Sequence, residues 1–499
     1  MPDATARRDP GGTGTRNGPA TVVVVGGGIA GLSAAWALLS GAGAMALRIV
    51  VLESDTRLGG KLLSVPIGGR SVDLGPDAFL ARRPEAVGLC EELGLADELV
   101  APGSRTAYVW ARRRLRPLPA GLALGVPTRL LPLARSRIVS PAGVARAALD
   151  LLGFGAPVGG DDGAVGTITR RHLGRQVTTH LVDPLIGGIH AGNCDTMSAA
   201  AVFPPLWAAG RRRGSLMRGL RTGAPGTGGP GAATEQQPVF LTLPGGMSQL
   251  VARLAEALRG RGVEIRTGRR VARLERRSGG EGSERPAWVV HGADEVVHAD
   301  ALIVATPVHV AAQLLGALDR DLGATLEGID DADVTLVTVR VPEGSVRTTL
   351  DGTGFLVPRV DGGLVTACTW LTSKWPHLRR PGDVLLRASA GRFGDDRPAQ
   401  LSDDDLVRRV LVELDPILGL DAPPLETVVT RWPGAFPQYA PGHLERVAGI
   451  EAAVGRHPGL AMAGAALRGV GIPACIDSGR RAAAAVLEHV AASTGGSAP

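Results

Sequence analysis

Three glycines near the start of the chain have the spacing of a dinucleotide-binding turn. Gly26, Gly28 and Gly31 follow the apolar run at residues 21–25. In this pattern the first glycine permits a tight turn, the second lets the backbone approach a pyrophosphate, and the third permits close helix–sheet packing. Glu53 stands 22 residues after Gly31, where a carboxylate can bind ribose hydroxyls. The sequence therefore predicts a dinucleotide site.

A second run, Arg57-Leu58-Gly59-Gly60-Lys61, follows Glu53 closely. Such a run is typical of FAD binding, because its glycines let the chain pass close to the cofactor and its arginine can order the phosphate loop. A Gly-Gly pair alone also marks ordinary turns, so the prediction of FAD binding depends on the position of the run just after Glu53. We predict FAD as the cofactor, and the expected contacts include the neighbouring residues Gly27, Ile29, Ala30 and Ser54.

The elements that must position these residues form a βαβ unit. We expect a strand at 21–25, a helix at 29–39 and a strand at 48–52, because the first apolar run is β-branched and the second segment is rich in alanine and leucine. Residues 21–47 carry no charge and could be mistaken for a membrane span or, after Arg7 and Arg8, for a secretion signal. Six glycines interrupt that segment, so a folded core is expected instead.

Later segments extend the same domain and add others. Apolar strands are expected at 301–305 and 460–463, with an Ala-rich helix at 475–490. Helices and Pro-rich loops fill residues 84–206, and strands dominate 333–430. We therefore expect a mixed α/β fold with a discontinuous, Rossmann-like FAD-binding domain, a helical insertion and a sheet-rich substrate domain. The expected FAD-binding segments are 20–85, 240–315 and 430–490, the insertion is 86–210, and the substrate domain is 211–239 and 316–429. We also expect a disordered tail at 1–19, a tail at 491–499 and a mobile loop at 222–234.

The charge balance is basic, with a net charge of +6 and a pI of about 9.7. Nucleic acid, an anionic membrane surface or an acidic small molecule could each explain this balance. Aromatic residues make up only 3% of the chain, so a base-stacking surface and a nucleic-acid partner are not expected. The four cysteines form no CxxC pair, so no metal site is expected, and free thiols in a reducing cytoplasm are the simplest account.

Eight longer strings carry a resemblance to a known family. They are VVVVGGGIAGLSAAWALL, ESDTRLGGKL, VDLGPDAFLARRPE, PLIGGIHAGNCDTMSAAAVFPPL, LPGGMSQLVARLAEAL, LTSKWPH, RWPGAFPQYAPGH and LAMAGAALRGVGIPACIDSGRRAA. Together they resemble the oxygen-dependent protoporphyrinogen oxidase family, and most closely its bacterial coproporphyrinogen III oxidase branch. The matches span about residues 21–490. The strings at 371–377 and 431–443 are specific to this branch, whereas the first is shared with amine oxidases and phytoene desaturases.

The resemblance implies a flavin amine oxidase-like architecture with a helical membrane-associating insertion. It implies that non-covalent FAD oxidises coproporphyrinogen III to coproporphyrin III in heme biosynthesis, with dioxygen as acceptor and hydrogen peroxide as product. The expected location is the cytoplasm, with peripheral contact at the inner face of the membrane and transient contact with the next heme-pathway enzyme. Further expected flavin contacts are Gly75, Pro76, Asp77, Ala78, Val271 through its backbone, Trp432, Gly464, Val470, Gly471 and Ile472.

The segment GIHAGN at 188–193 departs from the family pattern. Relatives usually carry Tyr or Phe where His190 stands, and the resemblance places the backbone of Gly188 near the substrate. His190 is therefore a candidate base, although a tolerated aromatic replacement is the alternative. No catalytic triad is required, because the flavin performs the difficult step and the protein supplies orientation and electrostatics.

The substrate's carboxylates call for cations. Coproporphyrinogen carries four propionates and protoporphyrinogen two, and arginine binds carboxylates with a planar fork. Arg82 and Arg83, which follow GPDAFL, are the first candidates, and Lys374 is another. The alternative is that these side chains are simply exposed, as most arginines are. The basic run Arg112, Arg113, Arg114 and Arg116 is more typical of a solvated or membrane-facing surface.

Three other functions compete with the leading one: protoporphyrinogen IX oxidase, flavin amine oxidase and a non-catalytic flavin-binding porphyrin carrier. Amine oxidation commonly uses an aromatic cage near the flavin. The chain has only two tyrosines, Tyr108 and Tyr439, and no aromatic residue between Leu460 and Arg480. The intact cofactor motifs argue against a carrier, and turnover by the purified protein would decide between the two.

Overall fold

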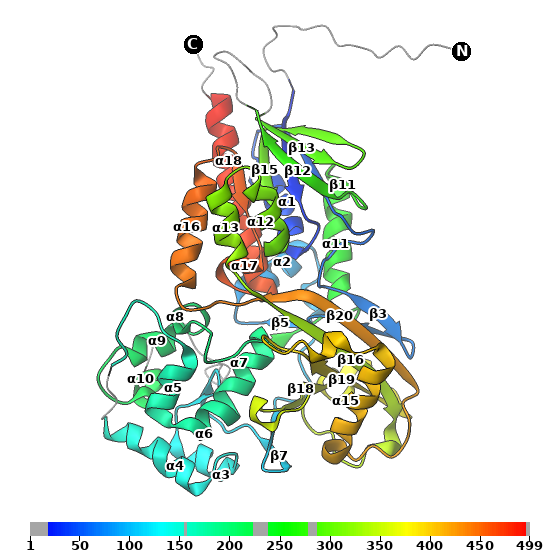
Figure 1. The fold of residues 1–499 in the computed structure, drawn as a ribbon. Helices are drawn as coiled ribbons and strands as arrows, with labels where there is room; N and C mark the ends of the chain where they lie inside the picture. Colours follow the sequence, from blue (N-terminus) through cyan, green and yellow to red (C-terminus); the bar gives the residue numbers. More distant parts are fainter. Residues whose placement is uncertain (1–17, 154–156, 223–237, 278–286, 496–499) are drawn as a thin grey trace.

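The computed structural model describes residues 18–153, 157–222, 238–277 and 287–495. The expected tail at 1–19 and the expected loop at 222–234 lie almost wholly outside these residues. Figure 1 shows an upper part built on a parallel sheet and, beneath it, a helical lobe beside a second, larger sheet. The expected tail at 491–499 begins inside the last helix, which runs to Gly495.

The upper part is organised by a five-stranded parallel sheet in the order β11-β2-β1-β15-β21. The β-branched residues of β1 suit a strand that is buried on both faces, and Val22, Val23 and Val24 are fully shielded from solvent. Val25 at the end of β1 lies opposite Leu52 of β2, so neighbouring strands end at one edge, where open α/β sheets bind ligands. The bounds are β1 (Ala20–Val25), β2 (Leu47–Leu52), β11 (Glu264–Arg266), β15 (Ala301–Val304) and β21 (Leu460–Met462).

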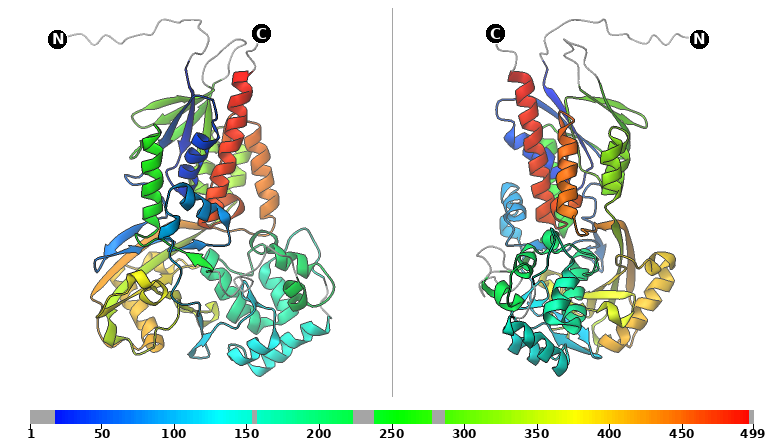
Figure 2. Two further views of the ribbon diagram at one scale, coloured as in Figure 1. Left: turned by 180° about the vertical axis from the view of Figure 1, so that it is seen from behind. Right: turned by 60° about the vertical axis from the view of Figure 1, so that its left-hand side comes forward.

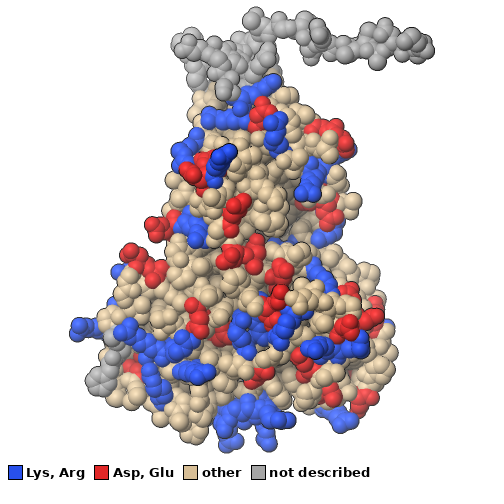
Figure 3. Space-filling view, in the orientation of Figure 1, with Lys and Arg blue, Asp and Glu red and all other residues tan. Residues whose placement is uncertain are grey.

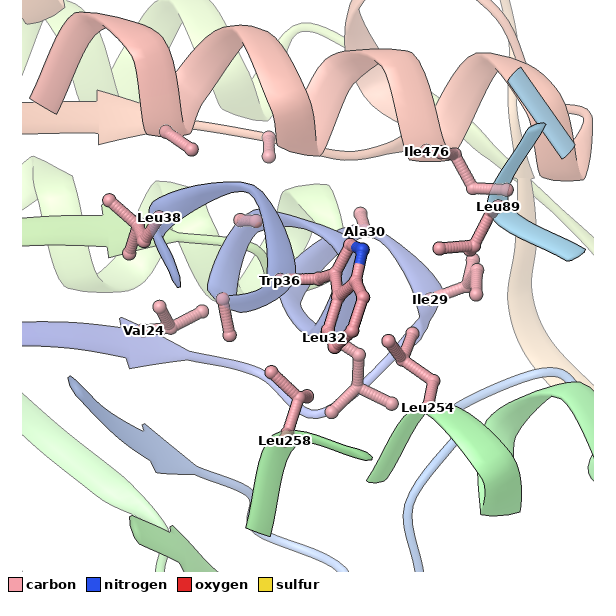
Figure 4. Packing of buried hydrophobic residues seen from close by; sticks show 14 of the residues in the cluster. Val24, Ile29, Ala30, Leu32, Trp36, Leu38, Leu89, Leu254, Leu258 and Ile476 are labelled. Carbon is pink, nitrogen blue, oxygen red and sulfur yellow. The ribbon is translucent and has the colours of Figure 1, made fainter. Parts of the chain in front are cut away.

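Helices cover both faces of this sheet. On one face Leu32 and Trp36 of α1 pack near Leu254 of α11, with Leu89 of α2 and Ile476 of α18 in the same hydrophobic cluster (Figure 4). Figure 2 shows α18 running beside α1, so the last helix of the chain packs on the first. This face holds α1 (Ile29–Gly41), α2 (Pro84–Glu92), α11 (Met247–Gly260) and α18 (Ile472–Gly495). The opposite face of the sheet is covered by α12 (Val308–Gly316), α13 (Arg320–Glu327), α16 (His443–Gly455), β12 (Val271–Arg276), β13 (Trp288–Gly292) and β14 (Val296–Ala299).

The second sheet has seven strands in the order β20-β16-β19-β18-β17-β6-β7. Its pairs are antiparallel except β17 with β6, and α15 (Asp403–Leu418) packs on one face. Two of its strands, β6 and β7, come from the segment expected to be a helical insertion. The bounds are β6 (Tyr108–Ala111), β7 (Arg114–Pro117), β16 (Asp331–Pro342), β17 (Gly354–Leu356), β18 (Val365–Trp370), β19 (Asp383–Ala390) and β20 (Glu426–Pro437).

The helical lobe has its own hydrophobic core, which includes Ile168, Leu181 and Leu206. A buried pair, His172 Nδ1 with Asp150 Oδ1 at 2.8 Å, ties two of its segments together. Across the part of the chain that is described, no helix has the length and apolar character needed to cross a membrane. The helices are α3 (Leu130–Ser136), α4 (Pro141–Ala148), α5 (Val165–Leu173), α6 (Arg175–Val177), α7 (Asp183–His190), α8 (Ala199–Val202), α9 (Pro204–Gly210) and α10 (Leu216–Thr222).

Short elements complete the fold between these three parts. They are β3 (Ser64–Ile67), β4 (Arg70–Asp73), β5 (Phe79–Leu80), β8 (Leu122–Ala123), β9 (Val126–Pro127), β10 (Phe240–Leu241), α14 (Leu371–Lys374) and α17 (Ala465–Arg468).

Candidate active site

The glycine turn joins β1 to α1 at the ligand-binding edge of the parallel sheet. Gly26 has φ +111°, and a Cβ there would lie 2.6 Å from the carbonyl oxygen of Ala305. A Cβ on Gly31 would lie 1.9 Å from the carbonyl oxygen of Gly26. Gly28 differs, because a Cβ there would meet no atom of the described residues within 4 Å. Packing therefore requires Gly26 and Gly31, whereas the side of Gly28 faces open space that a ligand can fill.

Glu53 is held against this turn. Its Oε2 accepts a hydrogen bond from the Gly27 amide at 2.6 Å. Its Oε1 accepts hydrogen bonds from the Asp55 amide at 2.8 Å and from the Ser54 hydroxyl at 3.1 Å. The carboxylate thus stands fixed beside the glycine turn, at the end of β2, as the spacing predicts for a ribose-binding group.

The run at 57–61 lies alongside the same turn. The Gly59 amide donates to the Gly27 carbonyl at 2.9 Å. The Arg57 guanidinium donates to the carbonyls of Gly60 at 2.5 Å and Leu58 at 3.3 Å. Gly59 and Gly60 both have positive φ, +100° and +57°. Arg57 therefore orders a loop that only glycines can form easily.

A dense polar network fixes the segment at 75–78. A Cβ on Gly75 would lie 2.1 Å from the carbonyl oxygen of Lys61, so this segment crosses directly over the loop at 57–61. The Asp77 carboxylate accepts hydrogen bonds from Lys374 Nζ at 2.8 Å, Trp375 Nε1 at 2.7 Å and Arg387 Nη2 at 3.1 Å. Burial alone would raise the pKa of Asp77, but Lys374 and Arg387 together hold that pKa well below its usual range.

Arg387 connects this network to the second sheet. It lies on β19 and is only 7% exposed. Its Nη1 donates to the carbonyls of Asp73 at 2.7 Å and Gly75 at 2.9 Å. The side chain therefore ties the expected flavin-facing segment to the sheet of the other lobe. Sequence reasoning missed it, although an arginine inside the apolar run VLLRASA was the available signal.

Lys374, expected to bind substrate carboxylates, has Asp77 as its ion-pair partner at 2.8 Å and a side chain only 14% exposed. Its ammonium also lies 4.9 Å from the centre of the Trp375 ring. The structure explains why Lys374 and Trp375 occur together in the string LTSKWPH, because both donate a hydrogen bond to the Asp77 carboxylate.

Trp432 and Lys61 lie at the crossing of these segments. Trp432 Nε1 donates to the Leu74 carbonyl at 2.7 Å, and the Arg57 guanidinium carbon lies 5.9 Å from its ring. Burial lowers the pKa of Lys61, and the charge of Asp331 opposes this shift. Val271 belongs to the same hydrophobic cluster as the last residues of β1 and β2. Trp432 and Lys61 therefore lie next to the segment at 74–78.

The segment at 464–472 forms a turn before α18. Gly464 has φ +131°, and its amide donates to the Ser478 hydroxyl at 3.0 Å. The Tyr439 hydroxyl accepts a hydrogen bond from the Gly469 amide at 2.8 Å and donates to the Ala465 carbonyl. Tyr439, which sequence reasoning did not assign, thus holds the turn from both ends. Val470 is half-buried, Gly471 is exposed and Ile472 is buried.

His190 and Gly188 lie at the C-terminal end of α7. His190 is 8% exposed, and burial lowers its pKa to about 4. Its Nδ1 has no hydrogen-bond partner within the described residues. Its ring centre lies 6.2 Å from that of Tyr439, so the ring stands close to the turn at 464–472. Gly188 is exposed and faces Leu356.

The remaining predicted cations lie on the surface. Arg82 and Arg83 are exposed, and Arg83 Nη2 and Nε bind the Glu85 carboxylate at 2.7 and 3.1 Å. Arg82 has no ion pair with any described residue. Of the basic run, Arg112 and Arg113 form the turn between β6 and β7, with φ +55° and +57°, whereas Arg114 and the half-buried Arg116 belong to β7.

Taken together, the open side of Gly28, the fixed Glu53 carboxylate and the glycine loop at 59–60 fit a bound dinucleotide. The parallel sheet and this turn define the class of dinucleotide-binding α/β proteins. Residues 29–487 match the model of the flavin containing amine oxidoreductase family. The chain therefore belongs to this family, and its cofactor is a flavin.

Individual relatives agree with this assignment over nearly the whole chain. Coproporphyrinogen III oxidase of Bacillus subtilis (strain 168) is 34% identical, with 95% of this chain and 99% of the relative covered. The enzyme of the same name from Propionibacterium freudenreichii is 35% identical, with 95% and 92% covered. A crystal structure from Exiguobacterium sp. 255-15, provisionally named protoporphyrinogen oxidase, has a TM-score of 0.82 at 30% identity, with 95% and 100% covered. The predicted resemblance and the mixed α/β fold class are confirmed.

Proposed function

We propose that this chain is an FAD-dependent oxidase that converts coproporphyrinogen III to coproporphyrin III in heme biosynthesis, with dioxygen as acceptor and hydrogen peroxide as product. The observation that carries the proposal is the likeness to coproporphyrinogen III oxidases across 95% of the chain. The glycine turn and the network at Asp77 support the proposal. The turn leaves space for the cofactor, and the network holds the segment at 75–78 in place.

FAD would be held without a covalent bond along the edge of the parallel sheet. Its pyrophosphate would lie at Gly28 and the N-terminus of α1, and a ribose would lie at Glu53. The backbone of Val271 would meet the adenine. The flavin ring end would be lined by Lys61, the segment at 75–78, Trp432, Gly464, Val470, Gly471 and Ile472.

When bound, the flavin supplies the acceptor for the hydride equivalents that leave the bridging carbons of the porphyrinogen. The chain's own residues orient the reactants. Asp77, Lys374 and Arg387 keep the segment at 75–78 in place, and Tyr439 keeps the turn at 464–472 in place. Lys374 would therefore act through Asp77, as a positioning residue.

His190 would line the reaction centre beside Gly188. Because burial lowers its pKa to about 4, the ring is neutral at pH 7 and holds an added proton only weakly. We therefore favour packing over proton transfer as its role. Arg82, which is exposed and has no ion pair within the described residues, is the better placed of the two adjacent arginines for meeting a propionate at the surface.

The division of labour among segments is also part of the proposal. Residues 20–85, 240–315 and 430–490 would bind the cofactor, and residues 211–239 and 316–429 would bind the substrate with help from 86–210. Strands β6 and β7 join the large sheet, so the segment at 86–210 contributes to the substrate side as well as to the helical lobe.

The lower end of the molecule would meet an anionic membrane surface. Figure 3 shows basic side chains gathered at the lower end of the molecule, where Figure 1 places β7 and α3. The exposed leucines Leu131 and Leu152, at 58% and 63%, belong to the same lobe. Basic and apolar side chains together favour peripheral binding to anionic lipid. A transient contact with the next heme-pathway enzyme stays a prediction.

A side-by-side assay tests the proposed function. The flavin-loaded protein is given coproporphyrinogen III or protoporphyrinogen IX in air, and porphyrin fluorescence, oxygen uptake and peroxide are followed. We expect coproporphyrinogen III to be oxidised with the higher kcat/KM. A preference for protoporphyrinogen IX would favour the alternative enzyme, and porphyrin binding without turnover would favour the carrier.

A further inference from the structure

A small hollow lies between α7 and the strands β17 and β18, next to Gly188. Its cavity volume is about 10 Å³, room for one water-sized group such as a carboxylate oxygen. Asp183 and Gly188 of α7 form one wall, Thr366 of β18 forms another, and Arg359 and Arg392 supply two guanidinium groups. The hollow is too small for a tetrapyrrole ring, but it adjoins the segment that the proposed function places near the substrate.

Arg392 is the unusual member of this hollow. Among the described residues three arginines are buried, Arg70, Arg387 and Arg392, at 4%, 7% and 7% exposed. Arg70 pairs with Asp383 at 2.7 Å and Arg387 pairs with Asp77 at 3.1 Å. Arg392 has no ion pair within the described residues, and its Nη2 donates to the Gly363 carbonyl at 3.2 Å. Because a buried cation is unfavourable without a partner, an anion is the missing component.

Arg359 adds a second guanidinium to the wall of the same hollow. Its Nη2 donates to the Gly192 carbonyl at 3.0 Å, which ties it to the segment at 188–193. Its Nε is buried and has no hydrogen-bond partner within the described residues, since Asp183 Oδ2 is 3.8 Å away. Arg359 therefore has Asp183 as its ion-pair partner and contributes positive charge beside Arg392.

The charges around Arg392 favour an anion. Burial and then the positive charge of Arg359 lower the pKa of Arg392, and Asp395 and Asp183 oppose this shift. The largest electrostatic effects on Arg392 come from Arg359, Arg397, Asp183 and Asp395. Asp183 lies 3.8 Å from Arg359 Nε. Asp395 already binds Arg397 at 2.7 Å, so neither aspartate neutralises Arg392 directly.

We propose that Arg392 and Arg359 form a carboxylate subsite that binds one propionate of the porphyrinogen, an inference that rests on the proposed function. The planar guanidinium of Arg392 binds a carboxylate through its N–H groups, and the positive charge of Arg359 beside it favours an anion. The subsite anchors the substrate at a distance from the bond that reacts, so it contributes to substrate binding and not to the chemical step.

Binding of the stable product coproporphyrin III tests this subsite without turnover. We measure its Kd by fluorescence with flavin-loaded wild type, Arg392→Gln, Arg392→Lys and the control Arg347→Gln, whose side chain is 73% exposed and pairs with Asp421. Coproporphyrin III tetramethyl ester, which lacks the carboxylates, is the second probe. We expect Arg392→Gln to bind the acid roughly ten- to hundredfold more weakly, Arg392→Lys to be intermediate, and all four proteins to bind the ester alike.

Kinetics and stability add independent readouts. With coproporphyrinogen III, Arg392→Gln should raise KM and leave kcat nearly unchanged, because a remote carboxylate interacts equally with ground and transition states. Without porphyrin, its Tm should equal or exceed that of wild type, because an unpaired buried charge is removed. A fall in Tm as large as that of Arg387→Gln would overturn the proposal, since Arg392 would then be structural.

The outcomes separate this inference from the proposed function. If wild type oxidises coproporphyrinogen III and Arg392→Gln binds coproporphyrin III as tightly as wild type does, the subsite is wrong and the proposed function stands. If wild type neither binds nor oxidises the tetrapyrrole acid, the proposed function fails and the subsite fails with it.

Discussion

Two buried arginines of neighbouring segments show opposite arrangements. Arg387 of β19 bonds to Asp77 and to the carbonyls of Asp73 and Gly75, so its charge and donors are engaged by the chain. Arg392 lies five residues further on and is equally buried, at 7%, yet it has no ion pair within the described residues. A buried arginine that pairs with a carboxylate of its own chain supports the fold. A buried arginine without such a partner indicates a site for an anionic ligand.

The largest expected effect on stability comes from replacing Arg387, the arginine that pairs with Asp77. Arg387→Gln removes the guanidinium that serves Asp77 and leaves that buried carboxylate with fewer partners. Breaking a buried pair in this way lowers the free energy of unfolding by about 3–5 kcal/mol, and we expect it to reduce flavin retention because the segment at 75–78 is released. Chemical denaturation and flavin content measure both effects.

The matched control is Arg347→Gln, which breaks an exposed pair and should change stability by no more than about 1 kcal/mol. If Arg387→Gln were as stable as this control, the buried Asp77 carboxylate would not need Arg387. The contrast between a structural Arg387 and a ligand-binding Arg392 would then be wrong.

The next effect is at the glycine turn. A Cβ at Gly28 meets no described atom within 4 Å, and its backbone has φ −72° and ψ 175°, so Gly28→Val should fold. The valine would occupy the space for the pyrophosphate, and we expect flavin affinity to fall more than tenfold, or about 1.4 kcal/mol. Circular dichroism reports the fold and the released flavin is quantified. A folded variant with full flavin content would show that this turn does not hold the cofactor.

A smaller effect concerns His190 and pH. Its pKa is about 4 in the folded chain against an ordinary 6.5, so the unfolded chain binds the proton more readily. This contribution to stability is present above pH 6.5 and is lost as pH falls from about 6.5 to 4. The free energy of unfolding should therefore decline less over this range in His190→Phe than in wild type.

The same variant separates packing from proton transfer. Loss of a catalytic base typically reduces the rate by about 10²–10⁴-fold, whereas a ring that only packs can be replaced by phenylalanine with little change. We expect kcat of His190→Phe to stay within about threefold of wild type, far from the loss that a base would show. A loss of a hundredfold or more would instead make His190 the base.

Local sequence was sufficient for the parts of the molecule that local geometry determines. The spacing of nearby residues predicted the dinucleotide site and the βαβ unit. These residues are the turn at 26–31, Glu53 and the loop at 57–61, which lie close together in the chain. The sequence also predicted the parallel strands at 301–305 and 460–463, because a continuous apolar run suits a strand buried on both faces.

The residues that were missed depend on contacts between distant segments. Arg387 meets Asp77 across 310 positions, and Tyr439 meets Gly469 across the turn before α18. With 54 basic residues in the chain, the pattern alone does not indicate which arginine is buried, nor that one of them lacks a carboxylate. For the same reason β6 and β7 were expected to belong to a helical segment, since only the pairing of β6 with β17 shows that they extend the large sheet.

The most direct test of the account is oxidation of coproporphyrinogen III by purified, flavin-loaded protein in air, compared with Gly28→Val under the same conditions. We predict that wild type forms coproporphyrin III at a rate proportional to its flavin content, with matching oxygen uptake, and that the rate of Gly28→Val falls in proportion to the flavin that it loses. Equal rates for the two proteins, or no oxidation by wild type with its full complement of flavin, would contradict the account.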